Sequence, residues 1–182
     1  MSIKEFDFTE CHQMSSGIAV NADVRQVLLD CLPGSLNAYP AAFANDRLGI
    51  DWWVEMPNGK HFAIDVKVRK EDWAASHPNE DDLALETWSV IENRKIGWTR
   101  DKFKRCDYVL WLWIDTKRYC LIPLPMLCKV FTTNWRAWSQ RFKVKQQKTS
   151  GFGPDYHSEC VFVPRHLIWA EIYKNFGGQL KK

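Results

Sequence analysis

The chain has 182 residues and a formal net charge of +3, and 46% of its residues are hydrophobic. This balance indicates an ordinary soluble globular protein, and the length fits a single domain over residues 1–182. The longest apolar run, 108–114, is far shorter than a bilayer span, and the first eight residues contain no apolar signal segment. We therefore expect a cytoplasmic protein with no membrane partner. Six scattered cysteines without a CxxC pair argue against a zinc module and favour a reduced compartment.

Hydrophobic periodicity and turn residues predict the following elements in chain order. They are a helix over 20–32, strands over 48–56, 60–69 and 84–91, a short basic helix over 98–106, a buried strand over 107–115, a strand over about 118–124, a helix from Pro125 to about 142, a loop or irregular hairpin over 143–158, an edge strand over 160–163 and a last helix from Pro164 to about Phe176. This order predicts an α/β fold around a mixed sheet rather than a doubly wound fold. No Gly-rich phosphate loop of the GxGxxG or GxxxxGK type occurs.

The turn between the first two strands determines which of their side chains face one another. Pro57-Asn58-Gly59 suits a three-residue loop with its glycine in the left-handed conformation, and such a loop pairs Met56 with Lys60. Counting back, the facing pairs are Val54–Phe62, Trp52–Ile64, Ile50–Val66 and Leu48–Val68, all of them apolar. A slip by one residue would place each of these against the opposite face, so the sequence favours the first register.

The same register places Asp51 opposite Asp65 on the other face of the sheet, with Lys67 pointing the same way. Like charges placed across a sheet repel one another, and a divalent cation is the simplest explanation for two facing carboxylates beside an ammonium group. Carboxylate oxygens suit Mg²⁺ or Mn²⁺, so we predict a metal site here. The alternative is a solvated sheet face with a surface ion pair.

These residues resemble the PD-(D/E)xK nuclease superfamily. Gly49-Ile50-Asp51 matches the first acid, Ile64-Asp65-Val66-Lys67 matches the second acid and the lysine, and the order of elements over about 20–115 is similar. The resemblance implies a restriction-endonuclease-like mixed β-sheet core flanked by helices, and Mg²⁺-dependent hydrolysis of phosphodiester bonds, most simply in DNA. It implies that Asp51, Asp65 and the Val66 carbonyl hold the metal while Lys67 positions the attacking water. Members of this kind occur in bacterial or phage-infected cells, and Asp23 is the nearest candidate for a further acid on the first helix.

Several other residues are candidates for the metal site or for contacts with nucleic acid. Glu86, on the next predicted strand, is a further metal ligand or simply an exposed strand residue. Trp53 shares the face of Asp51 and either stacks on a base or fills the sheet surface. Basic residues are predicted to contact phosphates, the alternative being a solvated face, and they are Lys102 and Lys104 on the short helix and Arg141, Lys143, Lys145 and Lys148 in the later basic segment.

Two rival functions stay open. A nuclease-fold protein can bind nucleic acid or a host defence protein without cutting, as a phage inhibitor would, and the acidic segment 71–86 and the ten tryptophans favour this alternative. A structural component with an incidental DxK tripeptide is the third reading. The sequence does not distinguish a monomer from a homodimer.

Overall fold

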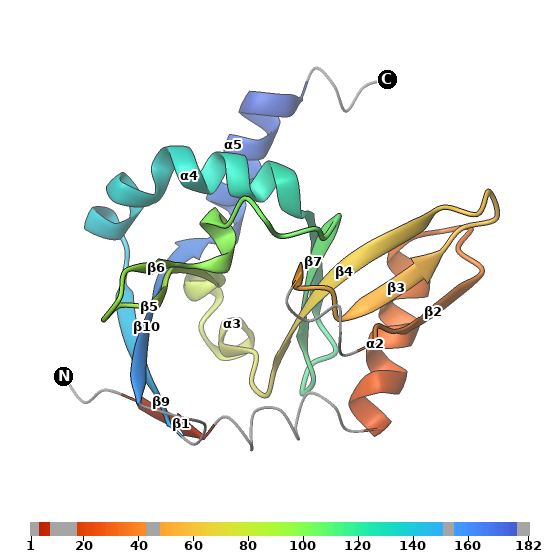
Figure 1. The fold of residues 1–182 in the computed structure, drawn as a ribbon, viewed down its shortest axis with the longest axis horizontal. Helices are drawn as coiled ribbons and strands as arrows, with labels where there is room; N and C mark the ends of the chain where they lie inside the picture. Colours follow the sequence, from red (N-terminus) through yellow and green to blue (C-terminus); the bar gives the residue numbers. More distant parts are fainter. Residues whose placement is uncertain (1–3, 8–17, 43–47, 151–154, 178–182) are drawn as a thin grey trace. The chain divides into compact units, whose positions relative to one another are not determined.

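The computed structural model describes residues 4–7, 18–42, 48–150 and 155–177, and its elements are shown in Figure 1. The chain forms two compact units. Unit 1 comprises residues 1–12, 77–102 and 126–182, and unit 2 comprises residues 13–76 and 103–125. Each unit contains one five-stranded sheet, so the protein is mixed α/β as predicted. The restriction-endonuclease-like arrangement and the single domain over 1–182 stay predictions.

Unit 2 contains a mixed sheet with the strand order β2-β3-β4-β7-β8 (Figure 1). The strands are β2 (Asn37–Pro40), β3 (Trp52–Glu55), β4 (His61–Arg69), β7 (Tyr108–Trp113) and β8 (Tyr119–Pro123). Neighbouring strands are antiparallel except β4 and β7, which run parallel. The run YVLWLW of β7 is apolar throughout because this strand lies inside the sheet and five of its six residues are buried.

Helix α2 (Ile18–Cys31) covers one face of this sheet and confirms the first predicted helix. Val24, Val27 and Leu28 pack there against alternate residues of the strands, among them Val54, Ile64, Val68, Leu110 and Leu112. The opposite face of β4 carries Ala63, Asp65 and Lys67. Asp23 therefore belongs to the helix on the other side of the sheet, where it forms an ion pair with Lys117.

The β3–β4 hairpin has the predicted register close to its turn. Trp52 pairs with Ile64 and Val54 with Phe62, the Met56 N–H donates to the Lys60 carbonyl, and Gly59 adopts the left-handed φ of 74°. The register predicted further from the turn is wrong, because β3 begins at Trp52 rather than at Leu48. Gly49 has a φ of 75°, and this turns the chain out of the strand before it can pair with Val66 and Val68.

Unit 1 contains the second sheet, with the strand order β1-β9-β10-β5-β6. Its strands are β1 (Lys4–Asp7), β9 (Val144–Ser150), β10 (Tyr156–Pro164), β5 (Asp82–Val90) and β6 (Lys95–Ile96). In segment 143–158 the consecutive strands β9 and β10 pair antiparallel in regular register, so the hairpin alternative is confirmed and only its irregularity is wrong. Residues 160–163 lie inside the sheet between β9 and β5, so the prediction of an edge strand is wrong. Strand β5 confirms the predicted strand over 84–91, and it pairs with β10 and β6.

The remaining helices include two that agree closely with the sequence patterns. These are α4 (Leu124–Arg141) and α5 (Arg165–Phe176), and the shorter ones are α3 (Trp73–Ser76), η2 (Pro78–Glu80) and η3 (Trp98–Arg100). The predicted basic helix over 98–106 is wrong beyond the single turn η3. Among the described residues, no helix has the length and apolar composition required to cross a bilayer.

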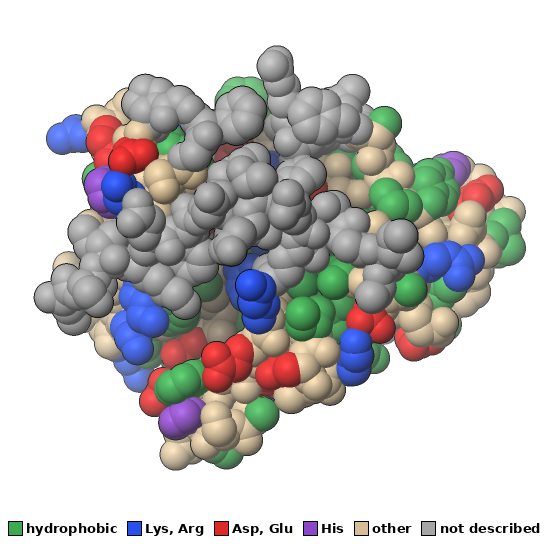
Figure 2. All heavy atoms as spheres, turned by 90° about the horizontal axis from the view of Figure 1, so that it is seen from below, with side chains coloured by type: hydrophobic (Ala, Val, Ile, Leu, Met, Phe, Trp, Pro, Cys, Tyr) green, Lys and Arg blue, Asp and Glu red, His purple; other side chains and the backbone are tan. Residues whose placement is uncertain are grey.

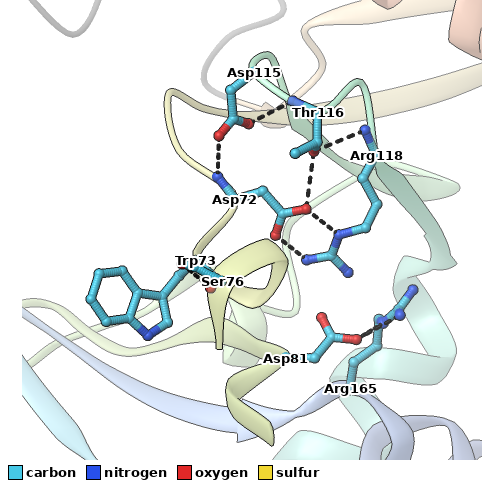
Figure 3. Close-up of polar contacts among 8 residues, drawn as sticks. All are labelled: Asp72, Trp73, Ser76, Asp81, Asp115, Thr116, Arg118 and Arg165. Carbon is cyan, nitrogen blue, oxygen red and sulfur yellow. Dashed lines mark hydrogen bonds and ion pairs between the residues drawn. The ribbon is translucent and has the colours of Figure 1, made fainter. Parts of the chain in front are cut away.

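Part of the acidic segment 71–86 is structural (Figure 3). Asp72 is 4% exposed, and its two carboxylate oxygens accept hydrogen bonds from Nε and Nη2 of Arg118, both at 2.6 Å. Thr116 donates a further bond to Asp72, and the Asp72 N–H donates to Asp115. Within unit 1, Asp81 pairs with Arg165. Two of the acidic side chains in this segment are therefore engaged in ion pairs within the protein.

We predict that Asp72→Asn lowers the free energy of unfolding by about 3 kcal/mol at pH 7, because it leaves the Arg118 guanidinium without its charged partner.

Hydrogen bonds from Arg118 hold the pKa of Asp72 below 3.8. The charged pair therefore contributes stability above about pH 4, and this contribution is lost as the pH falls through the lower folded pKa. Urea unfolding at pH 7 and at pH 3 measures both effects. Asp23→Asn, which breaks an exposed pair, is the control and should cost about 1 kcal/mol or less.

Candidate metal centre

Asp65 and Lys67 lie on the face of β4 opposite α2. They are two residues apart on a strand, so their side chains point the same way. Asp65 is 1% exposed, and its Oδ1 lies 2.5 Å from Nζ of Lys67, whose side chain is 24% exposed. A buried carboxylate thus lies beside the ammonium group of a largely buried lysine.

Asp51 joins this pair through the backbone of β4. Its Oδ2 accepts a 2.7 Å hydrogen bond from the N–H of Val66, the residue between Asp65 and Lys67. The Asp51 N–H donates to the Ile64 carbonyl, so the side chain and the backbone of Asp51 follow the same edge of β4. Because β3 begins only at Trp52, no backbone carbonyl of that strand accepts the hydrogen bond from the Val66 N–H, and the Asp51 side chain accepts it instead. The predicted proximity of Asp51 to Asp65 arises from this end of the strand rather than from regular pairing.

The turn before β3 is held by the segment that leads into β7. The Arg105 N–H donates to the Leu48 carbonyl at 3.2 Å, and the Cys106 thiol donates to the Gly49 carbonyl. The Lys104 side chain crosses the α-carbon of Gly49 so closely that a Cβ built there would lie 2.3 Å from its Nζ. The positive φ of this turn favours glycine, and a Cβ at this position would also displace the flexible end of the Lys104 side chain.

The charged groups of this cluster perturb one another. Burial and the negative charge of Asp65 raise the pKa of Asp51 to about 6, against the lowering effects of Lys67 and the Val66 N–H. Burial disfavours the charged form of Lys67, but Asp65 and Asp51 outweigh it and raise its pKa. Burial, followed by Asp65, raises the pKa of the Cys106 thiol to about 12, opposed by Lys104 and Lys67. Lys104 and Cys106 thus belong to the same electrostatic cluster as the two aspartates.

The cluster offers oxygen atoms suited to a hard divalent cation. Within the described part of the chain, Oδ2 of Asp65 is buried and accepts no hydrogen bond, which is costly for a carboxylate oxygen. The Val66 carbonyl faces the same edge of β4 as the Val66 N–H that binds Asp51, since the two groups of one residue point to one side. These donors fit Mg²⁺ or Mn²⁺ with several retained waters. Over residues 4–7, 18–42, 48–150 and 155–177, no group of three or more His, Cys, Asp or Glu side chains is placed to hold a metal ion.

Glu86 does not lie on a strand of the Asp65 sheet. It is on β5 in unit 1, where its Oε2 accepts a 2.9 Å hydrogen bond from the Trp98 N–H. Glu86 was included because its strand is the next one along the chain, and that strand belongs to the other sheet. Its role as a metal ligand stays a prediction.

The residues predicted to bind nucleic acid are divided between the units. Trp53 pairs with Ala63 on the Asp65 face of unit 2, half-buried, and its ring meets the His61 ring edge-on at 6.4 Å. Lys104 lies beside Gly49 in the cluster described above, whereas Lys102 is an exposed residue of unit 1. The structure therefore brings Lys104, but not Lys102, into the Asp51 cluster.

The later basic segment consists of the end of α4 and strand β9 in unit 1. Arg141 and Lys145 lie over the rings of Phe142 and Phe162, and Lys148 forms a 2.8 Å ion pair with Asp155. Lys143 is exposed, and its carbonyl accepts a bond from Phe162. On the face drawn in Figure 2, basic and acidic side chains are interspersed among the described residues, and neither sign covers that face alone. A role of this segment in binding nucleic acid stays a prediction.

Two members of the cluster were not selected from the sequence. Gly49 was quoted only as part of the first motif, and Cys106 was considered only as one of six scattered cysteines without a CxxC pair. A glycine inside a strand pattern often marks a bulge or a close approach of another segment, and this is the signal that indicates Gly49. Nothing in the sequence around Cys106 distinguishes it from a core thiol.

No protein-family model, curated protein or solved structure matches this chain. The geometry of the Asp51 cluster, with the residues that build it, is therefore the basis for proposing a function.

Asp51→Asn should be more stable than the parent at pH 7 in the absence of divalent ions, by about 1 kcal/mol, because it removes a charge that is disfavoured by burial and by repulsion from the buried Asp65 carboxylate. The asparagine oxygen can still accept the bond from Val66. Thermal unfolding in EDTA measures the difference. Asp107→Asn is a matched control, since the Asp107 carboxylate also accepts a backbone N–H of β4, from Ala63 at 2.8 Å. An equal gain in both variants would contradict the explanation by carboxylate repulsion.

Gly49→Ala should destabilise the protein by about 1–2 kcal/mol, because an L-residue is strained at a φ of 75°. It should also displace Lys104, which chemical modification of lysines followed by mass spectrometry detects as faster labelling of that residue. Gly34→Ala separates the two effects, because Gly34 has a φ of 85° with no atom within 4 Å of an added Cβ. If Lys104 is labelled at the parental rate in Gly49→Ala, the close approach described here is wrong.

Proposed function

We propose that this protein is a divalent-metal-dependent nuclease that hydrolyses phosphodiester bonds, most simply in DNA, at the cluster of Asp51, Asp65 and Lys67. The buried oxygen of Asp65 that accepts no hydrogen bond, beside a second carboxylate, carries the proposal. Such an arrangement is costly for stability, and a bound cation would compensate for it. The resemblance to the PD-(D/E)xK nucleases leads to the same three residues.

In this proposal each side chain has a separate task. Asp51 and Asp65 would hold Mg²⁺ or Mn²⁺ together with the Val66 carbonyl. The ion would supply Lewis-acid polarisation of the phosphate and a template for the attacking water. The Val66 N–H holds Asp51 in place, and Oδ1 of Asp65 holds the ammonium group of Lys67.

The two lysines act on the substrate rather than on the ion. Lys67 stays protonated because both aspartates raise its pKa, so it would orient water and stabilise negative charge that develops on the phosphate. Lys104, beside Gly49, would provide a second positive charge for the same phosphate. Trp53, on the same face as Asp65, would border the substrate.

A second candidate function is nucleic-acid or host-protein binding by a nuclease-like fold without catalysis. One observation favours it: Lys67 already forms an ion pair with Asp65, so the cluster is partly neutralised without any ion. A protein of this kind would bind its partner equally well in EDTA. The nuclease proposal requires the ion.

The decisive assay incubates the purified protein with linear, circular, single-stranded and branched DNA, and with RNA, in Mg²⁺, Mn²⁺ or EDTA. We expect ion-dependent cleavage, and a loss of at least about 100-fold in Asp65→Asn and Lys67→Ala, because each removes a group that stabilises the transition state. Lys60→Ala, at the turn of the same hairpin, should cleave like the parent. The divalent ion should also raise the melting temperature of the parent but not that of Asp65→Asn.

Two results would separate the alternatives. Cleavage by Asp65→Asn or Lys67→Ala at the parental rate would show that the residue assignment is wrong. Binding of nucleic acid without cleavage, together with no change of melting temperature on adding Mg²⁺ or Mn²⁺, would support the non-catalytic alternative. Glu86→Gln in the same melting experiment tests the predicted further ligand, because only a ligand should reduce the shift caused by the ion.

A further inference from the structure

Two arginines and two tryptophans form a second cluster, in unit 1, and the nuclease proposal uses none of these residues. It consists of Arg100 at the end of η3, Trp88 on β5, and Trp135 and Arg136 on α4. We refer to these four residues as the arginine–tryptophan cluster. Trp88 and Trp135 meet edge-on, with ring centroids 6.2 Å apart.

The position of Arg100 is determined by contacts on several sides. Its guanidinium carbon lies 4.1 Å from the centre of the Trp135 ring and 4.8 Å from that of Trp88. Its Nη1 donates a 3.0 Å hydrogen bond to the Thr87 carbonyl. A guanidinium group held against aromatic rings keeps its remaining N–H groups available in its own plane.

The turn that carries Arg100 is itself packed closely on β5. The Gly97 N–H donates to the Thr87 carbonyl, and the Thr99 hydroxyl donates to the Glu86 carbonyl. A Cβ at Gly97 would lie 2.2 Å from that Glu86 carbonyl oxygen, so only glycine permits this approach. Arg100 is therefore presented by a rigid support.

The second arginine makes the cluster electrostatically unfavourable by itself. The guanidinium carbon of Arg136 lies 4.7 Å from the centre of the same Trp135 ring. Burial, followed by the charge of Arg136, lowers the pKa of Arg100, although an arginine keeps its proton at neutral pH. None of the ion pairs found among the described residues involves either arginine. Two like charges thus share one ring, and no carboxylate of residues 4–7, 18–42, 48–150 or 155–177 forms an ion pair with them.

We propose that Arg100 and Arg136 form an oxyanion site that binds a phosphate group. Guanidinium groups present several N–H donors in one plane and match the oxygens of phosphate, and an anion would remove the repulsion between them. The two indole rings hold the arginines and offer apolar surface beside the anion. All four residues belong to unit 1 and none contributes to the Asp51 cluster, so this inference does not depend on the proposed nuclease activity.

Isothermal titration calorimetry on the full chain tests the site, at constant ionic strength set with chloride. The ligands are inorganic phosphate and a short single-stranded DNA, both in EDTA. Arg136→Gln is the main variant, because Arg136 is an exposed helix residue and its replacement should leave the fold intact. We expect it to weaken binding at least about tenfold. Arg94→Gln, which removes an equal charge from an exposed turn of unit 1, should bind like the parent.

Each outcome bears on the proposal. Binding of both ligands with the same dependence on Arg136 supports a site for any phosphate group. Binding of DNA alone assigns the site to a phosphodiester backbone, and binding of inorganic phosphate alone assigns it to a free or terminal phosphate. The proposal is wrong if neither ligand binds, or if Arg94→Gln weakens binding as much as Arg136→Gln, since that would indicate a general effect of net charge.

Discussion

The candidate centre depends on the hydrogen bond between the Val66 N–H and the Asp51 carboxylate. Strand β3 begins at Trp52, which pairs with Ile64, so the next backbone group of β4 on that side has no strand partner. An N–H left without an acceptor in such a place costs about 1–3 kcal/mol, and Asp51 prevents this loss. The bond brings Asp51 beside Asp65 although their charges repel. The need of the Val66 N–H for an acceptor therefore holds the Asp51 carboxylate beside Asp65, although the repulsion between the two carboxylates opposes this position.

Local patterns were sufficient for the hairpin but not for the place where it ends. The Pro57-Asn58-Gly59 turn and the alternation of apolar residues specify the register near the turn, because both act within a few residues. The turn at Gly49 is different, since it is held by Arg105 and Cys106, more than 50 residues later. A regular strand and a left-handed glycine are both compatible with the sequence LGID, and only the tertiary contact decides between them.

The strand with which a given strand pairs also depends on tertiary contacts, which the local sequence does not specify. The alternating burial of β5 was correctly predicted as a strand, but nothing in its own residues states that it pairs with β10, some 70 residues away, rather than with β4. Glu86 was a candidate metal ligand because its strand follows β4 along the chain, and the sequence does not show that this strand belongs to another sheet. The acidic segment shows the same limit, because the charge of Asp72 is neutralised by Arg118, which comes from another part of the chain.

The two proposed sites differ in how their charges are balanced. The Asp51 cluster combines two carboxylates with two ammonium groups, from Lys67 and Lys104, so its formal charge is close to zero without a metal ion, although one oxygen of Asp65 is buried and accepts no hydrogen bond. A bound divalent cation would give it the positive charge that a phosphodiester requires. The arginine–tryptophan cluster has two positive charges and no carboxylate partner among the described residues, so it should attract anions without any ion. If both proposals hold, phosphate binding in EDTA is due to the arginines, whereas dependence on a divalent ion is due to the aspartates. This difference in charge lets the two sites be distinguished in one protein.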